Sequence, residues 1–230
     1  MDYLSDGVSQ AFRLMVSLDR EMLSAVGVSL QVSSIAVGLA CLAGVPLGLL
    51  IGMRDFFGKA LVMTVLNTLM ALPTVVVGLV VYALLSRRGP LGVLGLLYTP
   101  RAMVIGQVLL ALPIITALSL SATQAVDPRA GRTALALGAS PVQASWAILR
   151  EARFGILASV MAGFGRVIAE VGCAMMLGGN IKGYTRTMTT AIALETGKGK
   201  FGLGIALGIV LLLIAFTVNL FTQVLTSKGR

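Results

Sequence analysis

The sequence predicts an all-α integral membrane protein with five transmembrane helices. Of its 230 residues, 57% are hydrophobic and only 12% are charged, which is about half the charged fraction of a soluble domain. The apolar residues fall into five runs, and each run has about the 20 residues that are needed to cross a bilayer core of roughly 30 Å. We therefore expect a single transmembrane domain over residues 1–230.

The first half of the chain begins with an amphipathic stretch, residues 5–20, that predicts a short interfacial helix. The first span is expected at 23–53, with a kink or break near Pro46 that neighbouring helices would tolerate. A polar turn, "RDFFGK", leads into the second span at 60–85, which carries Pro73 near its middle. Proline in both spans thus predicts departures from straight helices.

The remaining spans are expected at 102–124, 154–178 and 202–225. A connector rich in Gly and Pro precedes the first of these, and a second long connector, residues 178–200, precedes the last. An odd number of spans places the two chain ends on opposite sides of the membrane. Lys and Arg are almost evenly divided between the two sets of loops, so the positive-inside rule does not decide the orientation.

Composition and motifs disfavour several classes of function. The chain has no histidine, and its two cysteines lie in apolar runs, so we expect no metal site and no bound cofactor. No paired carboxylates or Ser–His pair suggest an enzyme. The Gly-rich stretches "GFGRVI" and "TGKGKF" do not match a phosphate-binding loop. The net charge of +9 is scattered over loops, which favours lipid, an acidic partner or an anionic solute over nucleic acid.

A polar segment, residues 127–153, interrupts the apolar runs. Asp127 followed by Pro128 is a helix start, Gly138 is a natural stop, and Ser140 followed by a proline restarts a helix. These signals predict a helix–glycine–helix elbow outside the bilayer. Its small and apolar side chains suit insertion into a groove on another protein. The alternative is a loop packed on its own bundle.

This elbow resembles the cytoplasmic coupling loop of the permease subunits of ATP-binding-cassette importers. In that family's Glu-Ala-Ala signature, Ala134 takes the second alanine, Gly138 the glycine and Ile148 the later isoleucine. The chain departs from the signature where Arg132-Thr133 replaces Glu-Ala and Arg150-Glu151 replaces Leu-Pro. The resemblance implies that a separate ATPase subunit is contacted by Arg132, Ala134, Leu137, Gly138, Ala139, Pro141 and Trp146.

Three further stretches are similar to permeases of the molybdate, sulfate and tungstate importers: "ALPTVVVGL", "SRRGPLG" and "GFGRVIAEVGCAMMLGGNIKGYTRTMTTAIALET". The five-span length and the end of the third stretch look most like the tungstate type. The resemblance implies the MetI-like fold of a type I ABC importer permease, with tungstate as the first candidate and molybdate or sulfate as alternatives.

The same resemblance implies the surroundings of the chain. It places the permease in a bacterial or archaeal cytoplasmic membrane, with its N-terminus outside and its C-terminus inside. The implied partners are membrane lipid, a second copy of the chain, two ATPase subunits that hold ATP and Mg, and an extracytoplasmic oxyanion-binding protein. No nucleic-acid partner is expected.

Charged side chains within the fourth span mark candidate sites. Arg166 and Glu170 are four residues apart, so they share a helix face, and each charge costs about 2.5–3.5 kcal/mol near the bilayer centre. They form either a structural ion pair or part of a translocation path or gate. Pro73, Thr74 and Asn180 are further path candidates. A secondary transporter or channel for a small anion is the alternative function, because broken spans occur there too.

Overall fold

The computed structural model describes the backbone of residues 2–227 and all their side chains except those of 2–6, 128, 132 and 227. The described chain is helical and contains no strand. Its elements in chain order are α1 (Asp2–Val16), α2 (Arg20–Met53), α3 (Lys59–Met70), α4 (Thr74–Leu85), η1 (Gly92–Leu94), α5 (Pro100–Gln124), α6 (Pro128–Ala136), α7 (Pro141–Glu151), α8 (Arg153–Ile168), α9 (Gly172–Gly178), α10 (Met188–Gly197) and α11 (Phe201–Ser227).

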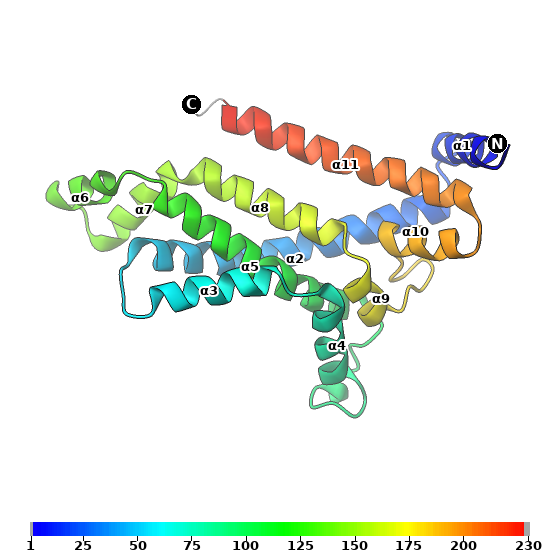
Figure 1. The fold of residues 1–230 in the computed structure, drawn as a ribbon, viewed down its shortest axis with the longest axis horizontal. Coiled ribbons are helices and arrows are strands. Elements are labelled where there is room, and N and C mark those ends of the chain that lie inside the picture. The colour runs from blue at the N-terminus through cyan, green and yellow to red at the C-terminus, as the bar shows by residue number, and fades with distance from the viewer. Residues whose placement is uncertain (1, 228–230) are drawn as a thin grey trace.

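The long helices lie side by side along one axis of the molecule (Figure 1). The α6–α7 elbow lies at one end of this axis, and α1 and α10 lie at the other. The described end of α11 points toward the elbow end, whereas α1 lies at the far end. The first and last described helices therefore begin and end toward opposite ends of the bundle, as an odd number of crossings requires.

Three helices, α2, α5 and α11, are each long and apolar enough to cross a membrane. Two further crossings arise if each of two bent helix pairs counts as one span: α3 with α4, bent by 92°, and α8 with α9, bent by 62°. The described residues thus provide three continuous spans, or five with the bent pairs. This arrangement confirms the all-α membrane architecture but makes two of its spans discontinuous.

The two breaks have different local causes. Pro73 has no N–H and disfavours helical backbone at the residue before it, which separates α3 from α4 as the sequence predicts. The break between α8 and α9 was not predicted, and it places Glu170 beyond the end of α8 rather than on its face. α2 continues through Pro46 without a break, and the kink expected there stays a prediction.

α2 packs closely against α5 next to this proline. A Cβ at Gly48 would lie 2.7 Å from the carbonyl oxygen of Thr116, so the two backbones approach more closely than any side chain allows. Close approach of this kind is the usual way in which transmembrane helices associate. Neighbouring helices can thereby stabilise a helix that has lost one of its own hydrogen bonds.

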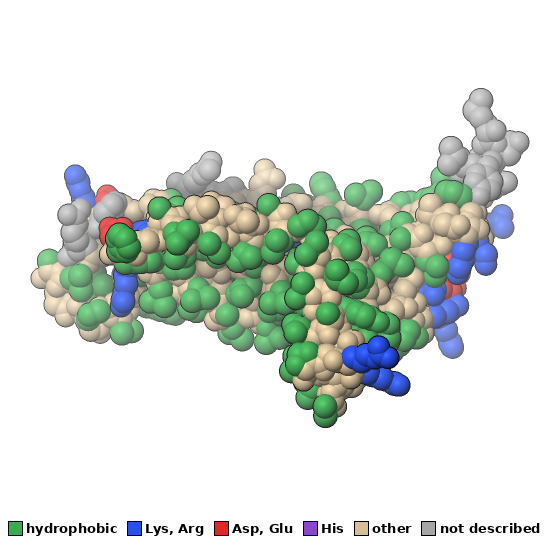
Figure 2. Space-filling view, turned by 60° about the horizontal axis from the view of Figure 1, so that its bottom comes forward, with side chains coloured by type: hydrophobic (Ala, Val, Ile, Leu, Met, Phe, Trp, Pro, Cys, Tyr) green, Lys and Arg blue, Asp and Glu red, His purple; other side chains and the backbone are tan. Residues whose placement is uncertain are grey.

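The amphipathic segment at the start of the chain forms α1, close to the predicted bounds. α1 packs on α11 through the fully buried Ala11, and it leaves Phe12 and Val16 exposed. α4 and the chain that follows it project from the bundle (Figure 1). Figure 2 shows hydrophobic side chains along the length of the bundle, whereas Lys and Arg gather at its ends and at the tip of this projection. Charge is therefore kept away from the middle of this face.

Candidate functional site

Local hydrogen bonds build the elbow between α5 and α8. The Asp127 carboxylate accepts the backbone N–H of Arg129 at 2.8 Å and so caps α6. Gly138 has a φ of 88° and turns the chain after α6. Ser140 and Gln143 then form a reciprocal capping box at the start of α7, with distances of 3.3 Å and 2.8 Å. The predicted start, stop and restart are all confirmed.

The outer face of the elbow exposes large apolar side chains. Leu137 is 83% exposed, and Trp146 is 68% exposed. Gly138 and Pro141 are also exposed, whereas Ala134 and Ala139 are half-buried. The Arg132 side chain lies outside the described residues, so its place in the elbow stays a prediction.

The two helices of the elbow pack on one another through Gly131, where a Cβ would lie 3.0 Å from Ile148 Cδ1. A cavity of about 440 Å³ opens where α7 meets α8 and is lined by Trp146, Leu149, Arg150, Arg153 and Ile156. The guanidinium of Arg153 lies 4.6 Å from the centre of the Phe154 ring. The elbow is thus a preformed surface with apolar and cationic character.

The two helix breaks lie side by side. A Cβ at Gly78 of α4 would lie 3.0 Å from Cys173 Cα in α9, so the two short helices are in close contact. At the breaks themselves, a Cβ at Gly172 would lie 2.8 Å from Val75 Cγ2 and 3.6 Å from Thr74 Oγ1. The sequence placed these breaks in different spans, and the fold brings them together.

Glu170 organises the break between α8 and α9. Its carboxylate is 3% exposed and accepts the backbone N–H of Cys173 at 3.0 Å, while its other oxygen lies 3.9 Å from Arg166 Nη1. The Thr189 hydroxyl donates to the Glu170 carbonyl oxygen at 2.6 Å. The predicted pairing of Arg166 with Glu170 is confirmed, but Glu170 also joins the break to α10.

Asn180 lies apart from this cluster, in the connector that follows α9. It adopts a φ of 52°, and its amide nitrogen donates to the Thr190 carbonyl oxygen at 3.3 Å. Its buried Oδ1 has no hydrogen-bond partner among the described residues. The structure therefore brings Pro73, Thr74, Arg166 and Glu170 to the paired breaks and leaves Asn180 in the connector.

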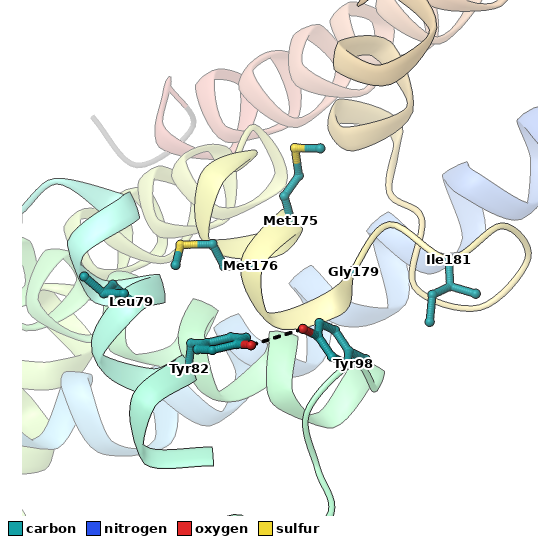
Figure 3. Close-up of a pocket in the computed structure, with 7 residues that line it drawn as sticks. All are labelled: Leu79, Tyr82, Tyr98, Met175, Met176, Gly179 and Ile181. Carbon is teal, nitrogen blue, oxygen red and sulfur yellow. Dashed lines mark hydrogen bonds between the residues drawn. The ribbon is translucent and has the colours of Figure 1, made fainter. Parts of the chain in front are cut away.

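A mostly apolar pocket of about 650 Å³ lies between α4 and α9 (Figure 3). Two tyrosine hydroxyls point toward one another across its rim, 3.3 Å apart. Its lining comprises Leu79, Tyr82, Tyr98, Met175, Met176, Gly179 and Ile181. Because no Lys or Arg is among these residues, the pocket offers no charged contact to an anion.

Sequence reasoning missed two features of this region. The Glu170 carboxylate accepts the Cys173 N–H at the start of α9. It does so at a break that the apolar run of residues 154–178 does not reveal. The Glu21 carboxylate, at the start of α2, binds Lys182 and Arg186 of the distant connector, each at 2.5 Å. A pairing over such a separation leaves no local signal in the sequence.

Comparisons with known proteins decide the family. Residues 44–230 match the family of the binding-protein-dependent transport system inner membrane component. The chain belongs to this family. It is 46% identical over 203 residues to a probable anion ABC transporter permease protein of Haloferax volcanii, covering 86% of this chain and 88% of that protein.

A second relative is the tungstate uptake system permease protein TupB of Campylobacter jejuni. It is 44% identical over 223 residues, which cover 97% of this chain and 93% of TupB. Among solved structures, an inward-facing MetNI methionine ABC transporter chain superposes with a TM-score of 0.75 at 15% identity, covering 93% of this chain and 98% of that chain. The fold is that of a type I ABC importer permease.

Membership of this family defines the class of the protein. A binding-protein-dependent permease of an ABC importer lies in a membrane and works with a binding protein and an ATPase. The elbow lies between the third and fourth crossings and has the predicted form of two short helices joined by a turn. The chain is therefore a permease subunit of an ABC importer.

Proposed function

We propose that this permease forms the membrane pathway of an oxyanion importer and that tungstate is its substrate. The observation that carries this proposal is the 44% identity with a tungstate uptake permease over 97% of the chain. Molybdate and sulfate are alternative cargoes, because both are tetrahedral dianions like tungstate. The pathway belongs to one transmembrane domain over residues 1–230.

The elbow is the docking element for a separate ATPase. Its exposed Leu137 and Trp146 offer apolar contacts, and the preformed turn at Gly138 presents them without further ordering. The docking surface comprises Arg132, Ala134, Leu137, Gly138, Ala139, Pro141 and Trp146. ATP and Mg bind the ATPase, and the permease itself carries no cofactor.

Two copies of the chain assemble with two ATPase subunits, and the pathway runs between the copies. This assembly follows the preference of oligomers for two-fold symmetry. α4 and α11 expose apolar side chains to lipid or to the second copy, among them Leu79, Val80, Phe216 and Phe221. An extracytoplasmic oxyanion-binding protein delivers the cargo at the end that carries α1 and α10.

The pathway passes the paired breaks, where Pro73, Thr74, Arg166 and Glu170 lie, and it opens outward near Asn180. Discontinuous helices are typical of transport sites, because their irregular backbone can line a polar route through the membrane. Arg166 supplies the positive charge that an anion needs within the mostly apolar pair of α8 and α9.

Transport in proteoliposomes tests the function. The permease is reconstituted with its ATPase, ATP and Mg inside and the binding protein outside, and uptake of tungstate, molybdate and sulfate is measured by elemental analysis. We expect ATP-dependent uptake with tungstate preferred. Uptake that needs neither ATP nor the ATPase would instead support a secondary transporter or channel.

The proposed orientation in a bacterial or archaeal cytoplasmic membrane places the N-terminus outside and the C-terminus inside. In a chain without Cys41 and Cys173, a single cysteine replaces either Ser17, after α1, or Val142, in the elbow; both are exposed. An impermeant thiol reagent should label the Ser17→Cys variant in intact cells and the Val142→Cys variant only after lysis. The reverse pattern would contradict the orientation.

A further inference from the structure

The Glu170 carboxylate is the fixed member of the pair at the break. It is almost completely buried, and one of its oxygens is held by the Cys173 backbone N–H at 3.0 Å. The Thr189 hydroxyl holds the Glu170 backbone at 2.6 Å. Because both its backbone and its side chain are bound, this carboxylate keeps its place whatever Arg166 does.

Arg166 is the loose member. Its side chain is 42% exposed, and its nearest approach to Glu170 is 3.9 Å, which is longer than a hydrogen bond. Within the part of the chain that the structure describes, its guanidinium forms no hydrogen bond. A guanidinium has five N–H donors in a planar fork that suits an oxyanion. Most of that capacity is unused here.

A second ion pair shows what a structural pair looks like in this protein. Arg186 is 12% exposed and binds Glu21 at 2.5 Å, joining the connector after α9 to the start of α2. The pair at the break joins positions only four residues apart, at a longer distance and with a more exposed arginine. The pair of Arg186 with Glu21 fastens distant segments, and the pair of Arg166 with Glu170 does not.

The Thr74 hydroxyl is a second unused donor at the breaks. The threonines inside α3, α5 and α11 donate to carbonyl oxygens of their own helices, as Thr64 does to Ala60 at 2.9 Å. Thr74 begins α4, so it lacks such an acceptor, and no hydrogen bond of its hydroxyl is formed with the described residues. A Cβ at Gly172 would lie within 4 Å of both Thr74 Oγ1 and Glu170 Oε1, so the hydroxyl and carboxylate flank one point.

We propose that Arg166 exchanges its counter-ion during transport: the passing oxyanion replaces Glu170 as the partner of the guanidinium and also accepts a hydrogen bond from Thr74. Glu170 stays bound to the Cys173 N–H and takes Arg166 back after the anion leaves. This inference rests on the proposed function, and it identifies the contact made by a tetrahedral dianion.

The fixed carboxylate explains how Arg166 can bind the anion and still release it. A dianion beside a lone arginine within the membrane would be held tightly, since charges attract strongly in a poorly solvated site. Glu170 repels the anion and competes for the guanidinium, which keeps binding weak enough for release. In the empty state the same pairing avoids leaving an isolated charge among apolar side chains.

The variant Glu170→Gln separates this role from a structural one. Its amide oxygen can still accept the Cys173 N–H, whereas the competing negative charge is gone. We would measure binding of radiolabelled tungstate to the permease–ATPase complex in nanodiscs without the binding protein. Uptake would be measured separately, in proteoliposomes with the binding protein outside. We expect the dissociation constant to fall at least about tenfold, which corresponds to about 1.4 kcal/mol, while maximal uptake falls because release slows.

Further variants keep the test decisive. Arg166→Gln should abolish binding, and Thr74→Val should weaken it, whereas the matched control Thr64→Val, which removes a hydroxyl from the exposed face of α3, should not. If Glu170→Gln does not fold, a double variant, Arg166→Gln with Glu170→Gln, replaces it. The two substitutions remove both charges and keep side chains of similar length. This double variant should bind no anion.

The outcomes distinguish the inference from the function on which it rests. Unchanged or weaker binding in folded Glu170→Gln, or wild-type binding in the double variant, would overturn the exchange. If the wild-type complex transports molybdate or sulfate instead, the same variants should alter the binding of that anion. A wild-type complex that transports none of the three oxyanions would overturn the proposed function itself.

Discussion

The two polar segments of the chain, the elbow at 127–153 and the connector at 178–200, are held in opposite ways. In the elbow, the side-chain hydrogen bonds of the described residues join positions no more than four apart, as in the capping box of Ser140. In the connector, Arg186 reaches Glu21, and the Met188 N–H donates to Ser29 Oγ across 159 positions. One segment folds on itself, and the other is fastened to the bundle.

The side chains of the elbow and the connector also differ in how deeply they are buried. Leu137 and Trp146 of the elbow face outward, whereas Thr185 and Thr190 of the connector are fully buried. A segment with local caps and exposed apolar side chains is built to bind a partner. A segment with long-range bonds and buried hydroxyls is built to hold the neighbouring helix breaks in place. Substitutions in the elbow should therefore change coupling, and substitutions in the connector should change stability.

The largest effect is expected at the turn of the elbow. Gly138→Glu should leave the bundle folded but lower ATP-driven uptake at least about tenfold. The backbone there has a φ of 88°, which costs a non-glycine residue roughly 1–2 kcal/mol, and a carboxylate would enter the docking surface. Uptake and ATPase co-purification are the measurements.

Gly58→Glu is the matched control for that variant. Gly58 has a φ of 91°, and a Cβ there would meet open space, as it would at Gly138. It lies in the turn before α3, outside the elbow. Equal loss of uptake in both variants would show that backbone strain, rather than docking, causes the defect.

In the connector, Thr185→Val should destabilise the protein by about 2 kcal/mol. The buried hydroxyl donates to the Gly178 carbonyl oxygen at 2.5 Å and accepts the Ile181 N–H at 3.0 Å. Valine has the same shape but leaves both groups unpaired. Thermal unfolding in detergent measures the change, and Thr222→Val, which removes only a bond within α11, is the control. Equal melting temperatures would contradict the anchoring role of the connector.

The local elements could be predicted from the sequence far better than the long-range ones. Asp127, Gly138 and Ser140 act through residues within four positions, so their pattern specifies the elbow directly. The apolar runs likewise specify the spans, because membrane solvation acts on each helix separately. The break at Pro73 was also foreseeable, since proline removes a backbone donor.

The paired breaks and the connector could not be predicted in this way. The break after Ile168 depends on the Glu170 carboxylate replacing a helical bond, and that residue was expected on the face of a continuous helix. The contact of Gly172 with Val75 and the pairing of Glu21 with Arg186 join segments that only the fold brings together. Sequence reasoning therefore identified Arg166 and Glu170 as a pair, and Thr74 separately, but not the proximity of Thr74 to that pair at the two breaks.

A smaller effect is expected at the cap of α7. Ser140→Ala removes the acceptor of the Gln143 N–H and half of the capping box, which should cost about 1 kcal/mol. Because the elbow folds on itself, hydrogen exchange should rise in the first turn of α7 and stay unchanged in α10. Ser145→Ala, which removes only a bond to the Pro141 carbonyl oxygen, is the control. Faster exchange in α10 would contradict the independence of the two segments.

The smallest effect concerns the response of the connector to pH. The hydrogen bond from Lys198 to Glu195, at 3.0 Å, holds the pKa of that carboxyl below its ordinary value, and the charges of Lys200 and Arg186 add to this against the opposing effect of burial. A lowered pKa in the folded state means that the interaction stabilises the protein above the ordinary glutamate pKa of about 4.3. The stabilisation is lost as pH falls through the lower, folded value.

Glu195→Gln should therefore lower the melting temperature slightly at pH 7. The free energy of unfolding should fall by less than about 1 kcal/mol, because Lys198 is half-exposed. The difference from the wild type should shrink as the pH falls below about 4.3. Glu151→Gln is the control, since that elbow carboxylate forms no ion pair with the side chains that the structure describes. Because only Glu195 belongs to the fastened segment, its variant alone should show a pH-dependent difference. A difference that stays constant from pH 7 to pH 3.5 would show that Glu195 contributes through its shape rather than through its charge.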